Sequence, residues 1–109
     1  MLDFNEYQEL ALRTAGNHGD FEKTLMYTAL GLNGEAGEVA EYIKKALFHG
    51  HDLDRAALEK ELGDVLWYLA VMARTLDLSL ADIAQHNIEK LARRYPDGFS
   101  QERSRNRNE

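Results

Sequence analysis

Four carboxylates recur in two matching stretches of the sequence. Residues 35–43 read Glu-Ala-Gly-Glu-Val-Ala-Glu-Tyr-Ile and residues 61–69 read Glu-Leu-Gly-Asp-Val-Leu-Trp-Tyr-Leu, so acid, Gly, acid, Val and Tyr coincide in register. Residues three apart project from one face of a helix, which makes Glu35 and Glu38 one pair of neighbouring carboxylates, and Glu61 and Asp64 another. If the two helices pack antiparallel, the pairs can share a site for Mg²⁺, which prefers carboxylate oxygens and keeps waters for substrate phosphates. Mn²⁺ is the alternative ion.

A solvated helix surface is the competing interpretation of each acidic pair, because charged pairs on amphipathic helices usually face water. Here both pairs adjoin strongly apolar residues, with Val39 and Ile43 after the first and Val65, Leu66 and Trp67 after the second. Carboxylates at such an edge must be neutralised, paired or bound to metal. A di-iron carboxylate site is disfavoured, because it requires Glu-x-x-His on its helices and the chain has none.

Glycines lie between the two acids in both stretches, at Gly37 and Gly63. Glycine inside a helix costs about 1 kcal/mol relative to alanine, so a packing reason should offset it. The sequence therefore predicts close contact between the two helices near the acids.

Apolar residues recur at helical spacing through four segments, and alternation typical of strands is absent. The predicted helices span about residues 3–15, 21–47, 55–76 and 80–94, with Asp20, Asp54 and Ser79 as N-caps of the last three. We therefore predict an all-α fold, an antiparallel bundle of about four helices in residues 1–99. A chain of 109 residues is marginal for enclosing a deep pocket alone, so we expect oligomerisation to complete it. Residues 100–109 are polar and predict a flexible tail.

The charge balance and the termini exclude several classes of protein. A formal net charge of -6 disfavours a broad surface for DNA or RNA phosphates. The chain lacks cysteine, its first nine residues do not resemble a secretory signal, and its longest apolar run, residues 65–73, is too short to span a bilayer. We expect a cytoplasmic protein that binds neither nucleic acid polymers nor membranes.

Four ordered blocks of the sequence resemble the MazG-like all-α nucleoside triphosphate pyrophosphohydrolases. They cover nearly the whole chain before the tail: Tyr7-Gln8 with Arg13-Thr14-Ala15; residues 34–41, Gly-Glu-Ala-Gly-Glu-Val-Ala-Glu; residues 61–70, Glu-Leu-Gly-Asp-Val-Leu-Trp-Tyr-Leu-Ala; and Asn87-x-x-Lys90-Leu-x-x-Arg94-Tyr-Pro-x-Gly98-Phe99. One acidic quartet would be a weak signal, but four blocks in order are a strong one.

The resemblance implies metal binding by Glu35, Glu38, Glu61 and Asp64. It also implies hydrolysis of a nucleoside triphosphate (NTP or dNTP) between its α and β phosphates, in a homodimer or homotetramer that serves to cleanse the nucleotide pool. One carboxylate would orient or deprotonate the attacking water, and we assign this catalytic role to Glu38.

Substrate contacts are predicted on the fourth helix and beside the acids. Lys90 and Arg94 are four apart and can share a face that grips phosphate oxygens, with Asn87 one turn earlier; a basic helix C-terminus favoured by the helix dipole is the alternative. Tyr68, one turn after Asp64, can reach the nucleotide or belong to the core.

Several residues and two rival functions stay open at this stage. Glu41 is a fifth ligand or, more in keeping with Lys44 and Lys45 nearby, a salt-bridge partner. His18, His49 and His51 lie in predicted loops, and only His18 is a candidate for a base pocket. The rivals are a non-catalytic helical interaction module and a pyrophosphohydrolase of another metabolite, such as one resembling phosphoribosyl-ATP. The sequence does not distinguish base, sugar, or standard from damaged nucleotides.

Overall fold

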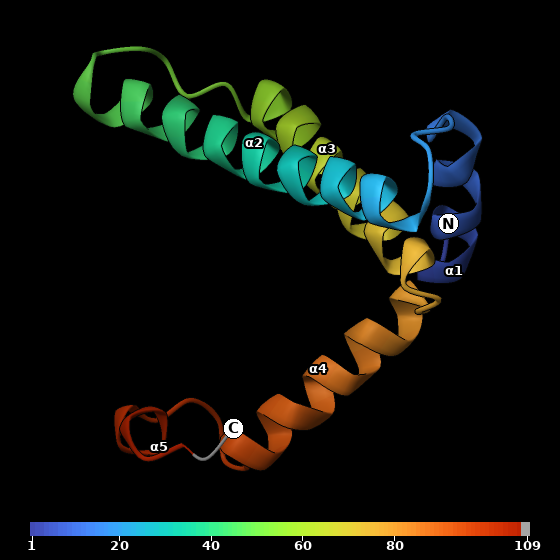
Figure 1. Cartoon of the computed structure of the whole chain (residues 1–109). Coiled ribbons are helices and arrows are strands. Elements are labelled where there is room, and N and C mark those ends of the chain that lie inside the picture. The colour runs from blue at the N-terminus through green and yellow to red at the C-terminus, as the bar shows by residue number, and fades with distance from the viewer. Residues whose placement is uncertain (108–109) are drawn as a thin grey trace.

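The computed structural model describes residues 1–107, and this range contains helices and no strand. The helices are α1 (Phe4–Ala11), α2 (Phe21–Phe48), α3 (Arg55–Thr75), α4 (Leu80–Arg94) and α5 (Gln101–Arg105), with a 3-10 turn at Leu12–Thr14 after α1 (Figure 1). The all-α prediction is confirmed. None of these helices combines the length and apolar character that crossing a bilayer requires.

Side-chain caps begin the three long helices at the predicted positions. Asp20 accepts a hydrogen bond from the backbone N–H of Lys23, and Asp54 accepts from those of Ala56 and Ala57. Ser79 accepts in the same way from Asp82. These bonds satisfy N–H groups that have no partner inside the helix, so each helix start is set locally by sequence.

Helices α2 and α3 form an antiparallel hairpin, the longest packed unit of the fold (Figure 1). Tyr42 ties its connecting loop to α2: the phenol oxygen accepts from the backbone N–H of Asp54 at 2.8 Å and donates to the carbonyl of the same residue at 3.3 Å. The tyrosine therefore fixes where α3 begins relative to the acidic stretch of α2.

A small core joins α1 to α3 and to the start of α4. Its buried hydrophobic residues are Ala11, Ala70, Val71 and Leu80. The buried Gln8 amide donates to the carbonyls of Ala70 at 3.2 Å and Leu78 at 3.0 Å, and its oxygen accepts from the backbone N–H of Leu80 at 3.0 Å. One side chain thus connects α1, α3 and the α3–α4 turn, and the direction in which α4 departs is set here.

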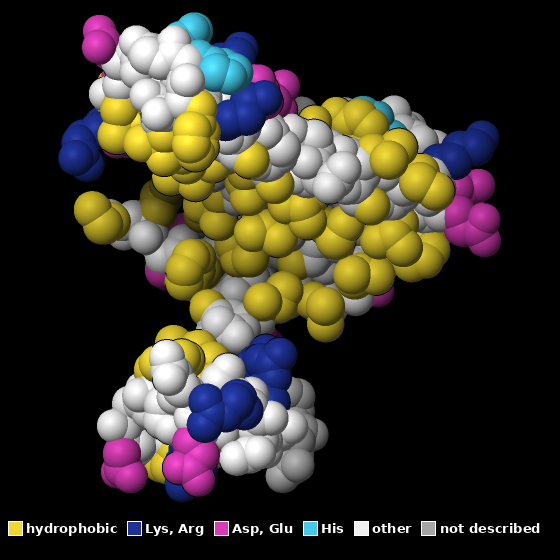
Figure 2. Space-filling model, turned by 90° about the vertical axis from the view of Figure 1, so that its left-hand side faces the viewer, with side chains coloured by type: hydrophobic (Ala, Val, Ile, Leu, Met, Phe, Trp, Pro, Cys, Tyr) yellow, Lys and Arg dark blue, Asp and Glu magenta, His cyan; other side chains and the backbone are white. Residues whose placement is uncertain are grey.

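Beyond this junction α4 diverges from the α2–α3 hairpin and leaves one side of it open (Figure 1). Large hydrophobic side chains are exposed on the hairpin and on α4. The exposed fraction is 64% at Leu30 and 70% at Leu47 of α2, and 63% at Ile88 of α4. Figure 2 shows a broad hydrophobic patch across the upper body of the molecule. A single chain therefore leaves much apolar surface in water, far more than the scattered residues usual on a monomer.

The predicted C-terminal tail, residues 100–109, is described as far as residue 107, and residues 108–109 lie outside the described residues. Residues 101–105 form the short helix α5, whose first turn is capped by Ser100 accepting from the backbone N–H of Arg103. Before it, Gly98 adopts φ 92°, a left-handed conformation that favours glycine, and the chain reverses there. The serine cap and the glycine turn give these described residues local order.

Candidate metal centre

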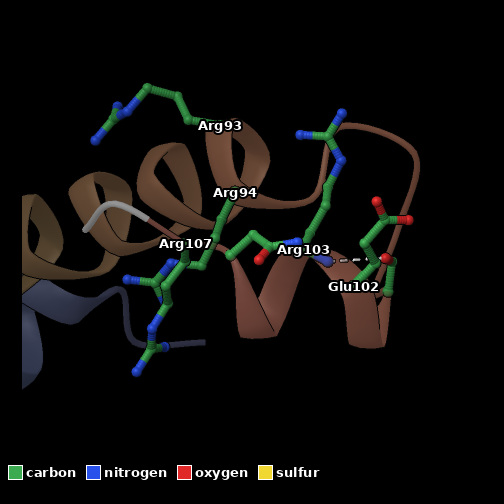
Figure 3. A pocket seen from close by; sticks show the side chains of 7 residues that line it. Arg93, Arg94, Glu102, Arg103 and Arg107 are labelled. Carbon is green, nitrogen blue, oxygen red and sulfur yellow. Dashed lines mark hydrogen bonds between the residues drawn. The ribbon is translucent and has the colours of Figure 1, made fainter.

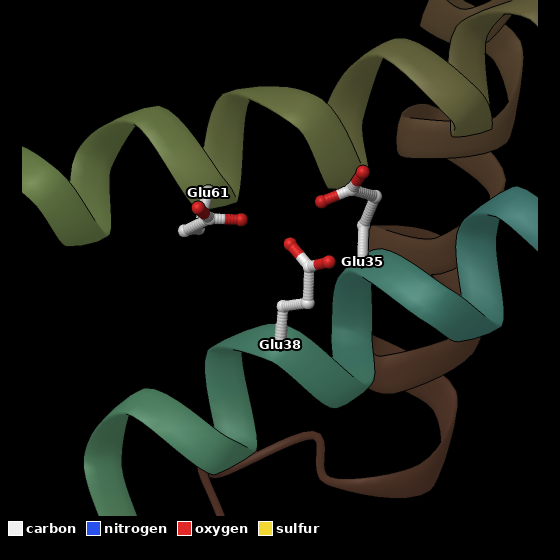
Figure 4. Close-up of side chains that lie close together, drawn as sticks. All are labelled: Glu35, Glu38 and Glu61. Atoms are coloured by element: carbon white, nitrogen blue, oxygen red, sulfur yellow. The ribbon is translucent and has the colours of Figure 1, made fainter. Parts of the chain in front are cut away.

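The antiparallel packing of α2 and α3 brings three of the four predicted carboxylates together. One oxygen from each of Glu35, Glu38 and Glu61 lies within 4.8 Å of the other two. Figure 4 shows Glu35 and Glu38 projecting from α2 toward Glu61 on α3. The i, i+3 spacing on α2 supplies two acids on one face, and α3 supplies the third across the helix pair.

Burial and mutual repulsion make these carboxylates costly to ionise. Glu35 and Glu61 are half-buried, and the Oε2 atom of each is buried without a hydrogen-bond donor among the described residues. Burial, followed by the charges of Glu38 and Asp64, raises the pKa of Glu35. A proton shared with Glu38, followed by burial, raises the pKa of Glu61. When all are ionised none can donate to another, so a bound cation is the partner that this arrangement lacks.

Asp64, the fourth predicted ligand, is exposed on α3 one turn beyond Glu61. It is outside the three-residue cluster, yet its negative charge raises the pKa values of both Glu35 and Glu61. Asp64 therefore lies at the edge of the same electrostatic site.

Glu41, the next acid along α2, has a different partner. Its carboxylate forms an ion pair with Lys44 at 3.0 Å, and this hydrogen bond is the main reason that the pKa of Glu41 is lowered. The salt-bridge interpretation is confirmed, and Glu41 is not in the cluster. The near-repeat places Trp67 at the matching position of α3, so the acidic row continues on α2 alone.

An aromatic wall next to the acids consists of four side chains: His18, Tyr27, Trp67 and Tyr68. The ring of Tyr68 lies 5.9 Å from that of Tyr27, on which the ring of His18 stacks at 3.6 Å. A hydrogen bond with Tyr27, followed by burial and the negative charges of Glu35 and Asp64, raises the pKa of Tyr68 to about 12. Tyr68 therefore stays neutral and can present an O–H group beside the carboxylates.

Trp67 contributes to this wall and to the core. Its indole packs edge-on against Tyr68, packs against the core cluster and donates from Nε1 to the hydroxyl of Thr14 at 2.9 Å. Assignment of Trp67 to the core or an interface agrees with its packing.

Helices α2 and α3 make their close contact at Gly31, and not at Gly37 or Gly63, where it was predicted. A Cβ atom on Gly37 or Gly63 would have no neighbour within 4 Å, so the prediction of tight packing there is wrong for the single chain. A Cβ atom on Gly31 would lie 2.1 Å from the Tyr68 ring. Helical spacing did not predict this pair, because spacing does not encode the rotation of α2 against α3 that decides which glycine faces the other helix.

The predicted substrate residues of α4 lie apart from the carboxylates in the single chain. Asn87 and Lys90 line a groove of about 500 Å³ whose walls are otherwise largely apolar, whereas Arg94 lines a separate cavity of about 360 Å³ at the end of α4. In Figure 1, α4 leads away from the α2–α3 hairpin that carries the acids. One chain alone therefore does not assemble the predicted phosphate contacts around the acidic cluster.

Comparison with known proteins identifies the family. The profile of the MazG nucleotide pyrophosphohydrolase domain matches residues 23–99, which include α2 from residue 23 onward, α3, α4 and all four acids. The chain is also 41% identical over 87 residues to the Gene 37 protein of Mycobacterium phage L5, covering 76% of each chain. No solved structure matches.

The chain belongs to the MazG nucleotide pyrophosphohydrolase family. Membership supports a nucleotide substrate and dependence on a divalent metal, for which Glu35, Glu38 and Glu61 are the candidate ligands. The donor set fits such an ion: all ligand atoms are carboxylate oxygens, the choice of hard cations such as Mg²⁺.

Proposed function

We propose that the chain hydrolyses nucleoside triphosphates, NTP or dNTP, to nucleoside monophosphate and pyrophosphate with Mg²⁺, or Mn²⁺ in its place, and so cleanses the cytoplasmic nucleotide pool. The observation that carries the proposal is the three-carboxylate cluster with two buried oxygens that lack donors. Such a cluster is unfavourable by itself and becomes favourable when a divalent cation binds. Family membership supplies the reaction class.

In this proposal Glu35, Glu38, Glu61 and Asp64 hold the metal, which when bound neutralises triphosphate oxygens and favours attack by water at the α phosphorus. Glu38 is the catalytic carboxylate that orients or deprotonates this water. Its support is accessibility: Glu38 is exposed, whereas Glu35 and Glu61 are half-buried. A base must reach a water that arrives from solvent, and Glu38 is the cluster member best placed to do so.

Tyr68 is proposed to bind the substrate from the aromatic wall. Its phenol is neutral because the pKa is raised to about 12, so it can donate a hydrogen bond to an anionic substrate. Gly31 allows the ring to lie flush against α2, since any larger residue would displace it.

We further propose that the active form is a homodimer or homotetramer. Two features support this: the exposed apolar surface on the α2–α3 hairpin and α4, and the separation of Asn87, Lys90 and Arg94 from the acids. A second copy would cover the first and could bring α4 residues to the carboxylates of its neighbour. Leu47→Lys, at a side chain 70% exposed, should then reduce the molecular mass measured by analytical ultracentrifugation, while Lys60→Gln should not. A monomer in the unaltered protein at micromolar concentration would refute the proposal.

The direct test is a panel of standard and modified nucleoside triphosphates with Mg²⁺, with pyrophosphate and monophosphate measured together. Glu38→Gln should lower kcat by about 10² or more, as loss of a catalytic acid–base group does. The matched control is Glu41→Gln, an acid of the same helix that pairs with Lys44 outside the cluster. It should retain activity.

Three results would count against the proposal. Release of single orthophosphate would exclude cleavage at the α phosphorus. Cleavage of a phosphoribosyl nucleotide in preference to every triphosphate would favour the metabolite pyrophosphohydrolase. No product from any nucleotide, with unchanged metal affinity in Glu38→Gln and Asp64→Asn, would favour a non-catalytic interaction module.

A further inference from the structure

Two tyrosines occupy the same position in the near-repeat of the acidic stretches. Tyr42 follows Glu35 by seven residues, and Tyr68 follows Glu61 by seven. Seven residues are about two helical turns, so each tyrosine lies on the same side of its helix as the acid that it follows. Tyr68 belongs to the aromatic wall, whereas Tyr42 has no part in the proposed catalysis.

Each tyrosine contacts the opposite helix, and the carboxylate cluster lies between the two contacts. The Tyr42 hydroxyl binds the backbone of Asp54, the N-cap of α3. The Tyr68 ring fills the space beside Gly31 of α2, where a Cβ atom would meet it. Gly31 precedes both clustered acids of α2 and Tyr42 follows them, so the two contacts flank the cluster.

The loop between the two helices does not set the start of α3 by its length alone. Residues 49–54 run back along the last turns of α2 before α3 begins (Figure 1). Tyr42 lies six residues before Phe48, the last residue of α2, which is about 9 Å along the helix axis. There its hydroxyl accepts from the N–H of Asp54 and donates to the carbonyl of the same residue. Tyr42 therefore selects one position for the end of the loop.

Asp54 is bound by both helices at once. Its carboxylate accepts from the N–H groups of Ala56 and Ala57 in the first turn of α3, while its backbone binds Tyr42 of α2. Glu61 follows Asp54 by seven residues, about two turns of the same helix. Since a helix moves as a rigid element, the distance of Glu61 from the acids of α2 depends on this joint.

The acidic contact between the helices requires such a joint, because its carboxylates repel one another. Glu35 and Glu38 on α2 face Glu61 on α3, with one oxygen of each within 4.8 Å of the other two (Figure 4). Without a cation, this repulsion favours separation of the two helices. A neutral hydroxyl that binds main-chain groups holds the helices together without adding charge. The ligands are thus near their final spacing before an ion arrives, which lowers the cost of binding it.

We propose that Tyr42 is a positioning residue that fixes the register of α3 on α2 and so makes the carboxylate cluster select a small divalent cation over a larger one. This role rests on the proposed metal site, because Tyr42 acts through its ligands. Mg²⁺ requires near-ideal octahedral geometry with oxygens at about 2.0–2.1 Å, whereas Ca²⁺ accepts irregular geometry at about 2.3–2.6 Å. Loss of the hydroxyl loosens the spacing between the helices and should weaken Mg²⁺ binding more than Ca²⁺ binding.

Tyr42→Phe tests this role, because it keeps the ring and removes only the hydroxyl. Calorimetric titration of the full chain without nucleotide should show an Mg²⁺ affinity lower by about fivefold, the equivalent of one typical hydrogen bond. The Ca²⁺ affinity should stay within about twofold. Amide hydrogen exchange measured by NMR should be faster at Asp54, whose N–H loses its acceptor.

The matched control is Ser100→Ala, which also deletes one hydroxyl that binds the backbone at the start of a helix. Ser100 accepts from the backbone N–H of Arg103 in α5 (Figure 3), and α4 carries α5 away from the hairpin (Figure 1). Neither ion should bind this control differently from the unaltered protein. Equal losses of Mg²⁺ and Ca²⁺ affinity in Tyr42→Phe would overturn the positioning role, since Tyr42 would then stabilise the hairpin without selecting the ion. An unchanged Mg²⁺ affinity would overturn it as well.

The two kinds of measurement separate this role from the proposed hydrolysis. A lower ratio of Mg²⁺ to Ca²⁺ affinity in Tyr42→Phe, in a protein that cleaves no nucleotide, would support the positioning role and refute the hydrolysis alone. Pyrophosphate release by the unaltered protein, with the same affinity ratio in Tyr42→Phe, would refute the positioning role alone. Absence of Mg²⁺ binding in the unaltered protein would overturn both.

Discussion

Two sites in the molecule place polar side chains at helix contacts: the junction where Gln8 contacts α3 and the start of α4, and the carboxylate cluster of Glu35, Glu38 and Glu61. They differ in whether the buried polar atoms have hydrogen-bond partners. Gln8 is buried, and both its amide nitrogen and its oxygen have partners, on α3, on the α3–α4 turn and at the first residue of α4. Glu35 and Glu61 each keep a buried oxygen without a donor. A buried polar group with full hydrogen bonding stabilises one fold, whereas one without partners costs stability until a ligand arrives. The first arrangement is therefore structural and the second is poised for a cation.

Removal of the Gln8 amide should produce the largest loss of stability. Gln8→Ala deletes three hydrogen bonds and removes the side-chain partner of the Leu78 carbonyl and of the Leu80 N–H, so the free energy of unfolding should fall by about 2–4 kcal/mol. Urea denaturation followed by circular dichroism measures this. Gln85→Ala, at an exposed residue of α4, is the control and should change little. A comparable loss in both variants would mean that the junction has no special role.

Crowding of Tyr68 at Gly31 should give the next largest effect. Gly31→Ala places a methyl group 2.1 Å from the ring, and the displacement should cost about 1–3 kcal/mol and increase KM if Tyr68 contacts substrate. Gly34→Ala meets nothing within 4 Å and should stabilise α2 by about 0.5–1 kcal/mol, because alanine has the higher helix propensity. The two glycines lie three residues apart, so equal effects of the same sign would contradict the packing described.

The pH dependence of stability should distinguish the cluster from an ordinary acidic surface. Because the folded pKa values of Glu35 and Glu61 are raised, protonation favours the folded state. In EDTA this contribution is complete below the ordinary pKa of 4.5 and is lost as pH rises through the raised values. Glu61→Gln should therefore raise the melting temperature in EDTA at pH 7, and the increase should be smaller at pH 4.5.

Mg²⁺ should reverse this comparison, because metal and protons compete for the same oxygens. In the unaltered protein the stabilisation by Mg²⁺ should grow from pH 5 to pH 8. In Glu61→Gln the stabilisation by Mg²⁺ should be smaller than in the unaltered protein. Melting temperatures with and without Mg²⁺ at each pH measure it. Stabilisation that is independent of pH and equal in the variant would place the metal elsewhere.

Local features of the sequence predicted the elements and most of the candidate site, and tertiary packing decided the remainder. Asp20, Asp54 and Ser79 begin helices where predicted, since capping needs only residues a few positions apart. The i, i+3 acids likewise follow from helical geometry. The contact between Gly31 and Tyr68 depends on how two helices rotate against each other, and the direction of α4 depends on Gln8, which bonds across about seventy residues of sequence. Neither is visible in a local pattern.

Glu41→Gln should give the smallest effect, and its comparison with Glu38→Gln stays within the single helix α2. Glu38 and Glu41 are both exposed acids three residues apart, but one faces the cluster and the other pairs with Lys44 at 3.0 Å. Exposed i, i+3 ion pairs contribute little, so Glu41→Gln should leave the free energy of unfolding and Mg²⁺ affinity unchanged within error. Glu38→Gln should weaken Mg²⁺ binding measured by calorimetry. Equal losses of Mg²⁺ affinity would show diffuse attraction by the acidic face of α2, whereas a loss in Glu38→Gln alone would mean that ligand geometry selects the ion.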